Sequence, residues 1–477
     1  MISAILIFPI VACILMFLIK RKTFNFVMLN MYAIVHVFIT GFLALNKDCG
    51  DIATKYFAVD NTNLIFLMVL SFVFLMVVIY NNGYMKNFDY SERKIRFYTA
   101  MVLIFVLSMT GTILSTDLAI SWILIEATTL SSAYLIYFNK TKHSIEAAWK
   151  YVFMCSIGIA LAFVGIILLN ISSGTINTMN FAQLYENAAT FDVAWLKMAF
   201  VFMMFGFGAK MGLAPVHFWL PDAHSEAPTP ISALLSATLL NSAFLVIVRV
   251  YKLMEVANCT NYARILLFLM GFISLFVTAV FVYHIKNYKR MLAYSSIENM
   301  GILAIGMALG GVAYYAVVLH LIGHSLAKAS FFLTSGNVLE LFESKRIKSV
   351  SGIIKADEKT GWLWVVSFLA ICAFPTSVLF ISEFIMIKTM LLSKYYILCV
   401  LFALLLTIIL FGIGRVVIKM AFGGLSKDKE KVIENNKYKI NILMYVPPIV
   451  MLILVFVFGL YIPDGLNKIL HLAAGAF

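Results

Sequence analysis

Hydrophobic residues in this chain are grouped into runs of about twenty, separated by short polar segments. A helix needs about 20 apolar residues to cross a bilayer, so the pattern predicts about fourteen transmembrane helices. The runs cover residues 2–19, 24–45, 62–82, 96–115, 116–138, 148–170, 195–216, 231–251, 263–283, 297–310, 312–336, 362–390, 395–421 and 441–461. No gap is long enough for a separate soluble domain. The pattern therefore predicts an all-α integral membrane protein with a single polytopic domain over residues 1–477.

Composition supports this class and excludes others. The chain is 62% hydrophobic and 12% charged, whereas a soluble domain is about a quarter charged and about half apolar. Lipid is the solvent that suits such a chain. The net charge of +13 does not indicate nucleic-acid binding, because the basic residues form short clusters between apolar runs. The six cysteines are scattered, and their spacing predicts neither a zinc site nor an iron–sulfur cluster.

The basic clusters fall in alternate loops, which predicts the orientation of the chain. Loops rich in Lys and Arg stay on the cytoplasmic side of a membrane, so both termini are predicted outside a multi-pass protein of the cell membrane. The clusters that support this orientation are Lys20-Arg21-Lys22, Arg93-Lys94, Lys289-Arg290 and the run 427–439. One segment on the same side, residues 217–230, contains two carboxylates and no Lys or Arg. This exception indicates a role other than orientation.

Two prolines lie inside apolar runs, Pro215 in the seventh and Pro375 in the twelfth. Proline removes a backbone hydrogen bond that lipid cannot replace, so both helices are predicted to be broken and to lie within the bundle. Broken helices occur at matching places in the inverted halves of transporters. A separation of five helices predicts two inverted five-helix repeats, helices 4–8 (about 96–251) and 9–13 (about 263–421).

Four ionisable residues lie inside the apolar runs: Glu126, Lys210, Lys328 and Glu383. A charge at membrane depth costs roughly 2.5–3.5 kcal/mol. Four unpaired charges would cost on the order of 10 kcal/mol, which is comparable to the stability of a whole domain. These groups must therefore be paired, hydrated or neutral. One interpretation is that they are ion pairs that hold helices together.

The spacing in the eleventh helix favours a second interpretation. His320, His324 and Lys328 follow one another at intervals of four residues, which places them in one polar stripe along a helix. Histidine exchanges protons readily near neutral pH. A stripe of titratable groups predicts a path for protons rather than a single contact between helices. Two histidines with no nearby third ligand do not predict a metal site.

The most specific pattern is the segment 210–230, KMGLAPVHFWLPDAHSEAPTP. It joins a buried lysine and a broken helix to a loop that contains two histidines and two carboxylates. Such side chains can carry protons from the cytoplasm toward Lys210. The residues predicted to take up protons are His217, Asp222, His224 and Glu226.

This segment closely resembles the proton antiporter module shared by respiratory complex I, multisubunit (Mrp-type) cation/proton antiporters and group 4 membrane-bound nickel–iron hydrogenases. The resemblance covers essentially the whole chain, and the run 224–241 looks most like component F of hydrogenase-4-type complexes. The other matching pieces are Asp60, Gly83-Tyr84-Met85, the helix around Glu126, the segments 146–151 (EAAWKY) and 289–299 (KRMLAYSSIEN), and Ser382-Glu383-Phe384.

The resemblance implies a fourteen-helix fold with inverted repeats, and roles for individual residues. Glu126 and Lys210 match the interacting pair of the proton path. His324 and Lys328 match the relay of the eleventh helix, and Glu383 matches the terminal carboxylate of the twelfth. Many members have a lysine in the eighth helix where this chain has Asn241. Because an amide does not titrate, the central link must use water or other groups.

The sequence thus predicts a proton-translocating subunit of an energy-converting oxidoreductase complex. It contains no G-x-G-x-x-G fingerprint, flavin motif or cluster ligands, so no cofactor is expected in this chain. The resemblance implies peripheral redox subunits with nickel–iron and iron–sulfur centres, and further membrane subunits and lipid as neighbours. Three alternatives stay open: a Na⁺/H⁺ antiporter subunit, an antiporter-like subunit of complex I, and a passive membrane scaffold.

Overall fold

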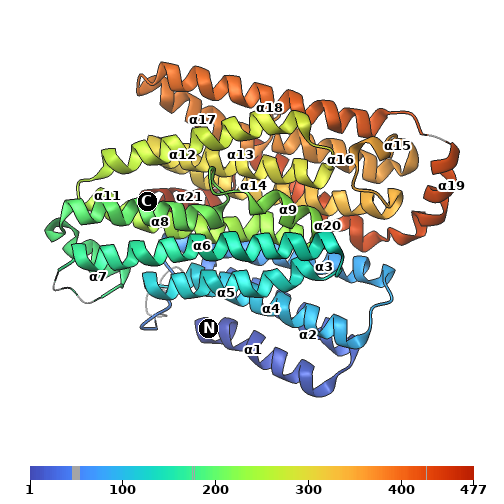
Figure 1. Ribbon diagram of the computed structural model, residues 1–477, viewed down its shortest axis with the longest axis horizontal. Helices are drawn as coiled ribbons and strands as arrows, with labels where there is room; N and C mark the ends of the chain where they lie inside the picture. The colour runs from blue at the N-terminus through green and yellow to red at the C-terminus, as the bar shows by residue number, and fades with distance from the viewer. Residues whose placement is uncertain (46–53, 175, 177, 426) are drawn as a thin grey trace.

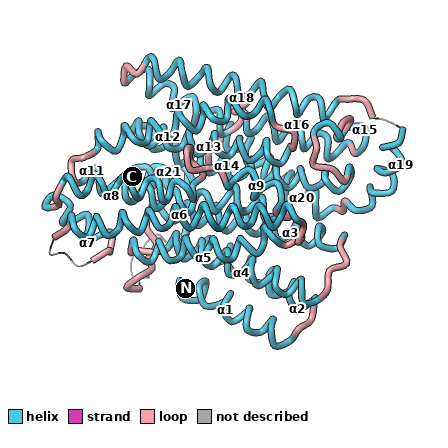
Figure 2. The backbone as a smooth tube through the Cα atoms, in the orientation of Figure 1, coloured by secondary structure: helices cyan, strands magenta, loops and turns pink. Residues whose placement is uncertain are grey.

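The computed structural model describes residues 1–45, 54–174, 176, 178–425 and 427–477. Apart from three isolated β-bridges, the regular structure of these residues is helical (Figure 2). Thirteen helical spans are long and apolar enough to cross a membrane. They are α1 (Ile2–Ile19), α2 (Lys22–Leu45), α3 (Asn61–Tyr84), α4 (Glu92–Leu114), α5 (Leu118–Tyr137), α6 (Lys142–Ser172), α8 (Val193–Met211), α10 with α11 (Thr229–Val256), α12 (Thr260–Phe281), α13 (Tyr288–Leu309), α14 (Val312–Phe342), α18 (Tyr396–Phe422) and α20 (Ile442–Leu460).

A fourteenth crossing is assembled from two half-helices, α16 (Glu358–Ile371) and α17 (Val378–Leu392). The predicted fourteen-helix membrane fold is therefore confirmed. The tenth helix, predicted to be short at 297–310, begins nine residues earlier, at Tyr288. The first part of this helix contains polar residues, which lower its mean hydropathy, so the apolar run does not include it. Most side chains of the helix are nevertheless buried inside the bundle.

Both predicted helix breaks are present. Helix α8 ends at Met211 with Gly212 in the left-handed conformation (φ 83°), and the chain re-enters a helix at α9 (Trp219–Glu226). The second break, between α16 and α17, contains Pro375, but this residue is exposed, so the second break lies at the edge of the bundle and not within it as predicted. A buried break exposes backbone groups that need partners. In the first break, the amide of Ala214 donates to Ser274 Oγ of α12 at 2.9 Å.

The centre of the bundle consists of α14, α13 and the span 229–256. In α14 and the span 229–256 the most apolar stretch is buried throughout, whereas less than half of that stretch is buried in α1, α2 and α18. Figure 1 shows α1 and α2 along one edge of the molecule and α17 and α18 along the opposite edge, with α14 between them. Helix α14, which contains His320, His324 and Lys328, is thus separated from lipid by other helices, whereas α17, which contains Glu383, lies at the edge.

The loops gather on two faces in the alternation that the charge pattern predicts. On one face Asn287 bridges Arg346, and on the other Phe57 bridges Ser115 and Asp117 bridges Asn180. Each bridge joins loops that the prediction placed on the same side. Which face is cytoplasmic stays a prediction at this point, as do the repeat boundaries 96–251 and 263–421. The two breaks do lie five crossings apart, as inverted repeats require.

Close helix packing positions the seventh crossing. Glycines on α6 and α8 allow the two backbones to approach each other, as small residues do in membrane helix pairs. A Cβ at Gly206 would lie 2.5 Å from the backbone nitrogen of Ala162 and 2.7 Å from the carbonyl oxygen of Gly158. Lys210 follows Gly206 by about one helical turn. The position of this lysine therefore depends on the contact between α6 and α8.

We expect Gly206→Ala to lower the free energy of unfolding by about 1–3 kcal/mol, because the added methyl group meets backbone atoms that cannot rotate away. Thermal unfolding of the purified protein in detergent measures the change. Gly41→Ala is the matched control, since a Cβ at Gly41 has no atom within 4 Å. Equal melting temperatures for the two variants would contradict the inferred packing.

Candidate functional site

Lys210 is completely buried on α8 and is surrounded by neutral oxygens. Its Nζ donates to the Tyr151 hydroxyl of α6 at 3.0 Å and lies 3.5 Å from Thr128 Oγ1 of α5. The ammonium also lies 4.9 Å from the centre of the Tyr151 ring. The Tyr151 oxygen is in turn 2.6 Å from Ser132 Oγ. The cation is thus held by hydroxyl groups and an aromatic face.

Glu126 is half-buried on the same α5 segment but makes no ion pair with Lys210. Its carboxylate accepts hydrogen bonds from Thr129 Oγ1 at 2.9 Å and from Ser156 Oγ at 3.4 Å. Within the described residues, the ion pairs with N–O distances up to 4.0 Å do not include either residue. The implied interacting pair is therefore separated in this structure, because Tyr151 and Thr128 occupy the hydrogen-bonding positions of the ammonium.

Two predicted uptake residues line a polar cleft on the face predicted to be cytoplasmic. Asp222 contacts Arg290 at 2.6 Å and Lys150 at 3.4 Å, and Glu226 contacts Lys345 at 3.1 Å. The cleft has a volume of about 330 Å³. Its side chains come from α6, α9 and the start of α13. Acidic and basic groups therefore meet where the seventh crossing reaches the surface.

The two histidines of the same segment are buried below this cleft. His217 packs against Phe218, with ring centres 4.7 Å apart. His224 stacks on Phe332 of α14 at 4.8 Å, and neither of its ring nitrogens has a hydrogen-bond partner in the protein.

His224 faces a different half of the molecule from the one the sequence analysis assigned to it. The cations that act on it electrostatically are Lys328 and Lys289, on α14 and α13. The prediction had placed it on a route toward Lys210. The reason for the difference is that α9 packs between α6 and α13, so its two faces meet two different halves of the protein.

The predicted stripe on α14 exists and faces α13. His320, His324 and Lys328 are all completely buried. Lys328 Nζ donates to Ser295 Oγ at 2.6 Å and to the carbonyl of Leu292 at 2.7 Å. Both ring nitrogens of His324 lack a partner in the protein. Because buried polar atoms are almost always hydrogen-bonded, we expect ordered water beside this ring.

His320 occupies a pocket that can hold either of its protonation states. Asn299 donates its amide N–H to the carbonyl of Ser295 at 2.7 Å, which leaves its oxygen to accept from His320 Nε2 at 3.1 Å. On the other side, Nδ1 lies 2.9 Å from Ser382 Oγ, which also lies 2.8 Å from the Leu379 carbonyl. The Ser382 hydroxyl donates to a neutral ring, or accepts from a protonated ring and donates to Leu379. Both states are fully hydrogen-bonded.

Asn241 links α11 to the α14 stripe. Its side-chain amide donates to Ser325 Oγ at 2.7 Å and to the carbonyl of Ala237 at 2.8 Å. Ser325 directly follows His324 on α14. A five-residue π-helical segment, Leu235–Leu239, precedes this position. Such segments are common at functional sites.

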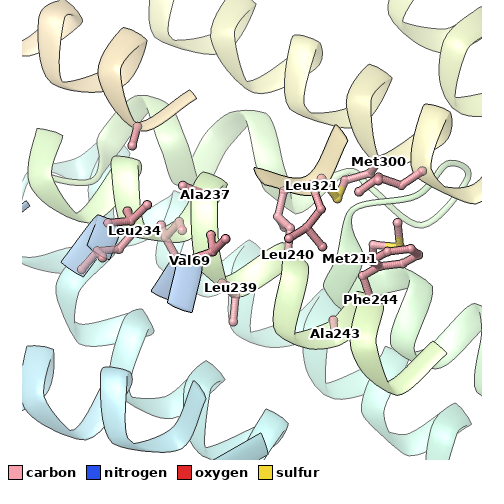
Figure 3. Close-up of a cluster of buried hydrophobic side chains, with 14 of the residues drawn as sticks. Val69, Met211, Leu234, Ala237, Leu239, Leu240, Ala243, Phe244, Met300 and Leu321 are labelled. Atoms are coloured by element: carbon pink, nitrogen blue, oxygen red, sulfur yellow. The ribbon is translucent and has the colours of Figure 1, made fainter. Parts of the chain in front are cut away.

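The surroundings of Asn241 are largely apolar. Figure 3 shows buried hydrophobic side chains from α8, α11, α13 and α14 around this region, among them Met211, Leu240, Met300 and Leu321. In this region the two lysine-containing halves meet through the Asn241–Ser325 hydrogen bond and a contact between Ser236 Oγ and Ser296 Oγ at 2.8 Å, both set among apolar neighbours. Whether protons pass through this link with water, as the replacement of lysine by Asn241 implies, stays a prediction.

Glu383 on α17 shares a cavity of about 200 Å³ with a second carboxylate, Glu298 of α13. The resemblance included Glu298 in a motif but assigned it no role. The signal that identified Glu126, a carboxylate inside an apolar helix, also applies to Glu298. The hydropathy pattern obscured it, because the run 297–310 places Glu298 at the end of a helix that extends back to Tyr288.

Tyr151 is a second residue of the site that the sequence reasoning missed. A tyrosine in an apolar run is ordinary, so only its contact with Lys210 reveals it. No group of three or more His, Cys, Asp or Glu side chains that could hold a metal ion lies in the described part of the chain. The expectation that this chain binds no cofactor stays a prediction.

The family model and the related proteins that match this chain all describe membrane subunits of one family. Residues 115–410 match the family model described as NADH:quinone oxidoreductase/Mrp antiporter, TM. The chain is 30% identical to a hydrogenase-4 component F homolog from Methylacidiphilum infernorum, over 97% of this chain and 96% of that protein. It is 27% identical to Na(+)/H(+) antiporter subunit A1 from Staphylococcus haemolyticus, over 84% of this chain and 52% of that protein.

Two solved structures share the fold. A chain of the membrane-bound sulfane sulfur reductase, an archaeal respiratory membrane complex, superimposes with a TM-score of 0.87 at 21% identity, over 99% of this chain and 97% of that chain. A chain of the Mrp complex from Dietzia sp. DQ12-45-1b superimposes with a TM-score of 0.85 at 17% identity, over 100% of this chain and 96% of that chain.

We expect Tyr151→Phe to slow any process that needs a charged Lys210 by about tenfold or more, because a hydrogen bond to a charged group contributes about 1.5–3 kcal/mol. The rate of ion movement in vesicles that contain the assembled complex measures the effect. Tyr315→Phe is the control, since it removes a hydroxyl that bonds Asn467 at 2.9 Å, on other helices. The same loss in both variants would show that the effect is not specific to Lys210.

Proposed function

The chain belongs to the membrane family of NADH:quinone oxidoreductase and Mrp antiporter subunits, and on this basis we propose that it moves protons across the membrane for a hydrogenase-4-like complex. The similarity to a hydrogenase-4 component F homolog over nearly the full length of both chains supports this choice among the family's complexes. Partner subunits carry out the electron transfer, and this chain couples to them through changes in its buried charges.

The burial of Lys210 and Lys328 without a carboxylate in contact is the observation that carries the proposal. Both lysines are completely buried, and their hydrogen-bond partners are hydroxyl groups and a backbone carbonyl. Structural ion pairs would place a carboxylate in contact with each ammonium. A lysine held by neutral oxygens can release its proton without leaving an unpaired carboxylate behind. The arrangement favours proton transfer over a passive scaffold, which gains nothing from the cost of these charges.

The proposed path joins the two halves. Protons enter from the cytoplasmic cleft at Asp222 and Glu226 and reach Lys210. They pass the contact between Asn241 and Ser325, arrive at Lys328 and its histidines, and leave through Glu383 toward the outside. The Lys- and Arg-rich loops on the same face as this cleft support this direction, because such loops stay on the cytoplasmic side. The likeness to a Na(+)/H(+) antiporter subunit supports Na⁺ as the second candidate ion, and pumping in Na⁺-free vesicles distinguishes the two.

We expect Lys210→Ala and Glu126→Gln to abolish proton pumping while the complex stays assembled in the membrane. Each variant removes one of the groups whose interaction would drive transfer. Proton uptake into vesicles, measured beside the redox turnover of the same preparation, tests this. Lys197→Ala is the control on the same helix, because that side chain lies over the ring of Tyr262 away from the site. Undiminished pumping by an assembled Lys210 variant would refute the proposal.

The proposed direction requires the Lys-rich loops to be cytoplasmic. Tyr438 and Tyr461 are 80% and 63% exposed, on the two opposite faces. We expect an impermeant maleimide added to intact cells to label Tyr461→Cys and not Tyr438→Cys, in a background without reactive cysteines. Inverted membrane vesicles should give the opposite result. Labelling of Tyr438→Cys alone in intact cells would reverse the assignment of uptake and release.

A further inference from the structure

The cavity that contains Glu383 is lined by a second carboxylate for which the proposed path has no use. Glu298 comes from the middle of α13, and Glu383 comes from α17 just after the break in the twelfth crossing. The remaining lining includes Ile371, Cys372 and Ala373 at the end of α16, and Thr407 of α18. Two acidic side chains thus face one small cavity at membrane depth.

Glu298 has no structural task in the described part of the protein. It is only 9% exposed, yet no hydrogen bond or ion pair involves its side chain among the residues that the structure describes. Other carboxylates of the chain do have such tasks: Asp357 caps α16 through the amide of Thr360 at 2.9 Å, and Glu343 pairs with Lys439 at 3.0 Å. An acidic group that is buried, unpartnered and directed into a cavity costs stability. This cost is expected only where the group has a function.

The electrostatic neighbours of Glu298 place it between two residues of the path. Lys328 is the cation that acts on Glu298, and Glu298 is the charged group that acts on Glu383. Lys328 Nζ is bonded to Ser295, which lies three residues before Glu298 on α13. Side chains at this spacing are neighbours, about 5–6 Å apart on a helix surface. The flexible lysine stem can therefore move from Ser295 to Glu298, directly or through one water molecule.

We propose that Glu298 relays protons from Lys328 to Glu383, an inference that rests on the proposed function. In the first step an N–H bond of the Lys328 ammonium breaks and an O–H bond forms on the Glu298 carboxylate. An ammonium and a carboxylate become a neutral amine and a neutral acid, so this step removes two opposite charges from the apolar interior and leaves only the Glu383 carboxylate that accepts the proton next. In the second step the O–H bond of Glu298 breaks and one forms on Glu383. Glu298 is again a carboxylate, ready for the next proton.

The two carboxylates also keep the free-energy change of the second step small, so that proton transfer between them is reversible and can be repeated. Two carboxylates in one cavity of low dielectric do not both ionise readily, because like charges repel. One proton shared by the pair can lie on either residue at similar free energy. Release of that proton from Glu383 leaves two facing charges, and this repulsion draws the next proton from Lys328. The cavity thereby links release on one side to transfer on the other.

The test uses the whole complex in sealed vesicles, with proton pumping and redox turnover measured together. Glu298→Gln keeps the shape of the side chain but cannot carry a proton, and we expect pumping per turnover to fall at least tenfold. Glu298→Asp keeps a carboxylate and should retain part of the activity. Glu340→Gln is the control, because Glu340 is similarly buried (7% exposed) on α14 but bonds Asn87 outside the cavity. It should pump normally.

A second measurement keeps the inference testable if a variant assembles poorly. Infrared difference spectra of the complex should contain the carbonyl stretch of a protonated carboxyl group that shifts in D₂O. We expect the band to shift or weaken in Glu298→Gln and in Glu383→Gln, because each variant leaves one carboxyl group in the cavity, and to be unchanged in Glu340→Gln. Glu298→Asp, which keeps a carboxyl group in the cavity, should show a shifted band. A band that is unchanged by Glu298→Gln would overturn the relay.

The outcomes separate this inference from the proposed function. If Lys210→Ala and Glu383→Gln both pump normally, the proposed function itself is wrong. If those two variants stop pumping while Glu298→Gln pumps at the normal ratio, the function stands and the role of Glu298 is wrong. Loss of pumping in Glu298→Gln with recovery in Glu298→Asp supports both.

Discussion

The burial of two lysines without a contacting carboxylate is the constraint on which the rest of the structure depends. An ammonium at membrane depth costs several kcal/mol unless its surroundings compensate. Around Lys210 the compensation comes from Tyr151 and Thr128, and around Lys328 from Ser295 and a backbone carbonyl. These contacts stabilise the charged form without a carboxylate within hydrogen-bonding distance. Removal of these hydrogen bonds would therefore leave each ammonium without a partner in the interior.

The helix breaks and the close packing of α6 with α8 follow from this constraint. A polar group inside a bundle needs neighbours at short range, and glycines such as Gly206 bring the α6 and α8 backbones together beside Lys210. The break at Gly212 allows the amide of Ala214 to bond Ser274 of α12, and residues that precede Pro375 at the end of α16 line the cavity of Glu383. The outer helices separate the centre of the bundle, α13, α14 and the span 229–256, from lipid.

Much of the site could be predicted because a charge inside an apolar run is conspicuous. Glu126, Lys210, Lys328 and Glu383 were identified in this way, and the spacing of His320 and His324 placed them on one face of a helix. Glu298 escaped the same criterion because polar residues at the start of α13 hide half of that helix from a hydropathy pattern. Tyr151 was not identified because tyrosine is common in membrane helices. Its role follows only from its hydrogen bond with Lys210 Nζ.

The sequence by itself determined the class of protein, the number of crossings, the two breaks and the alternation of the loops. These properties depend on local composition, since each crossing must be apolar and about twenty residues long whatever its neighbours are. Only the tertiary structure decided which polar groups meet. It separated Glu126 from Lys210, turned His224 toward α14 and brought Glu298 into the cavity of Glu383. These contacts join residues far apart in the chain, and their geometry follows from how the helices pack against one another rather than from the pattern within any one helix.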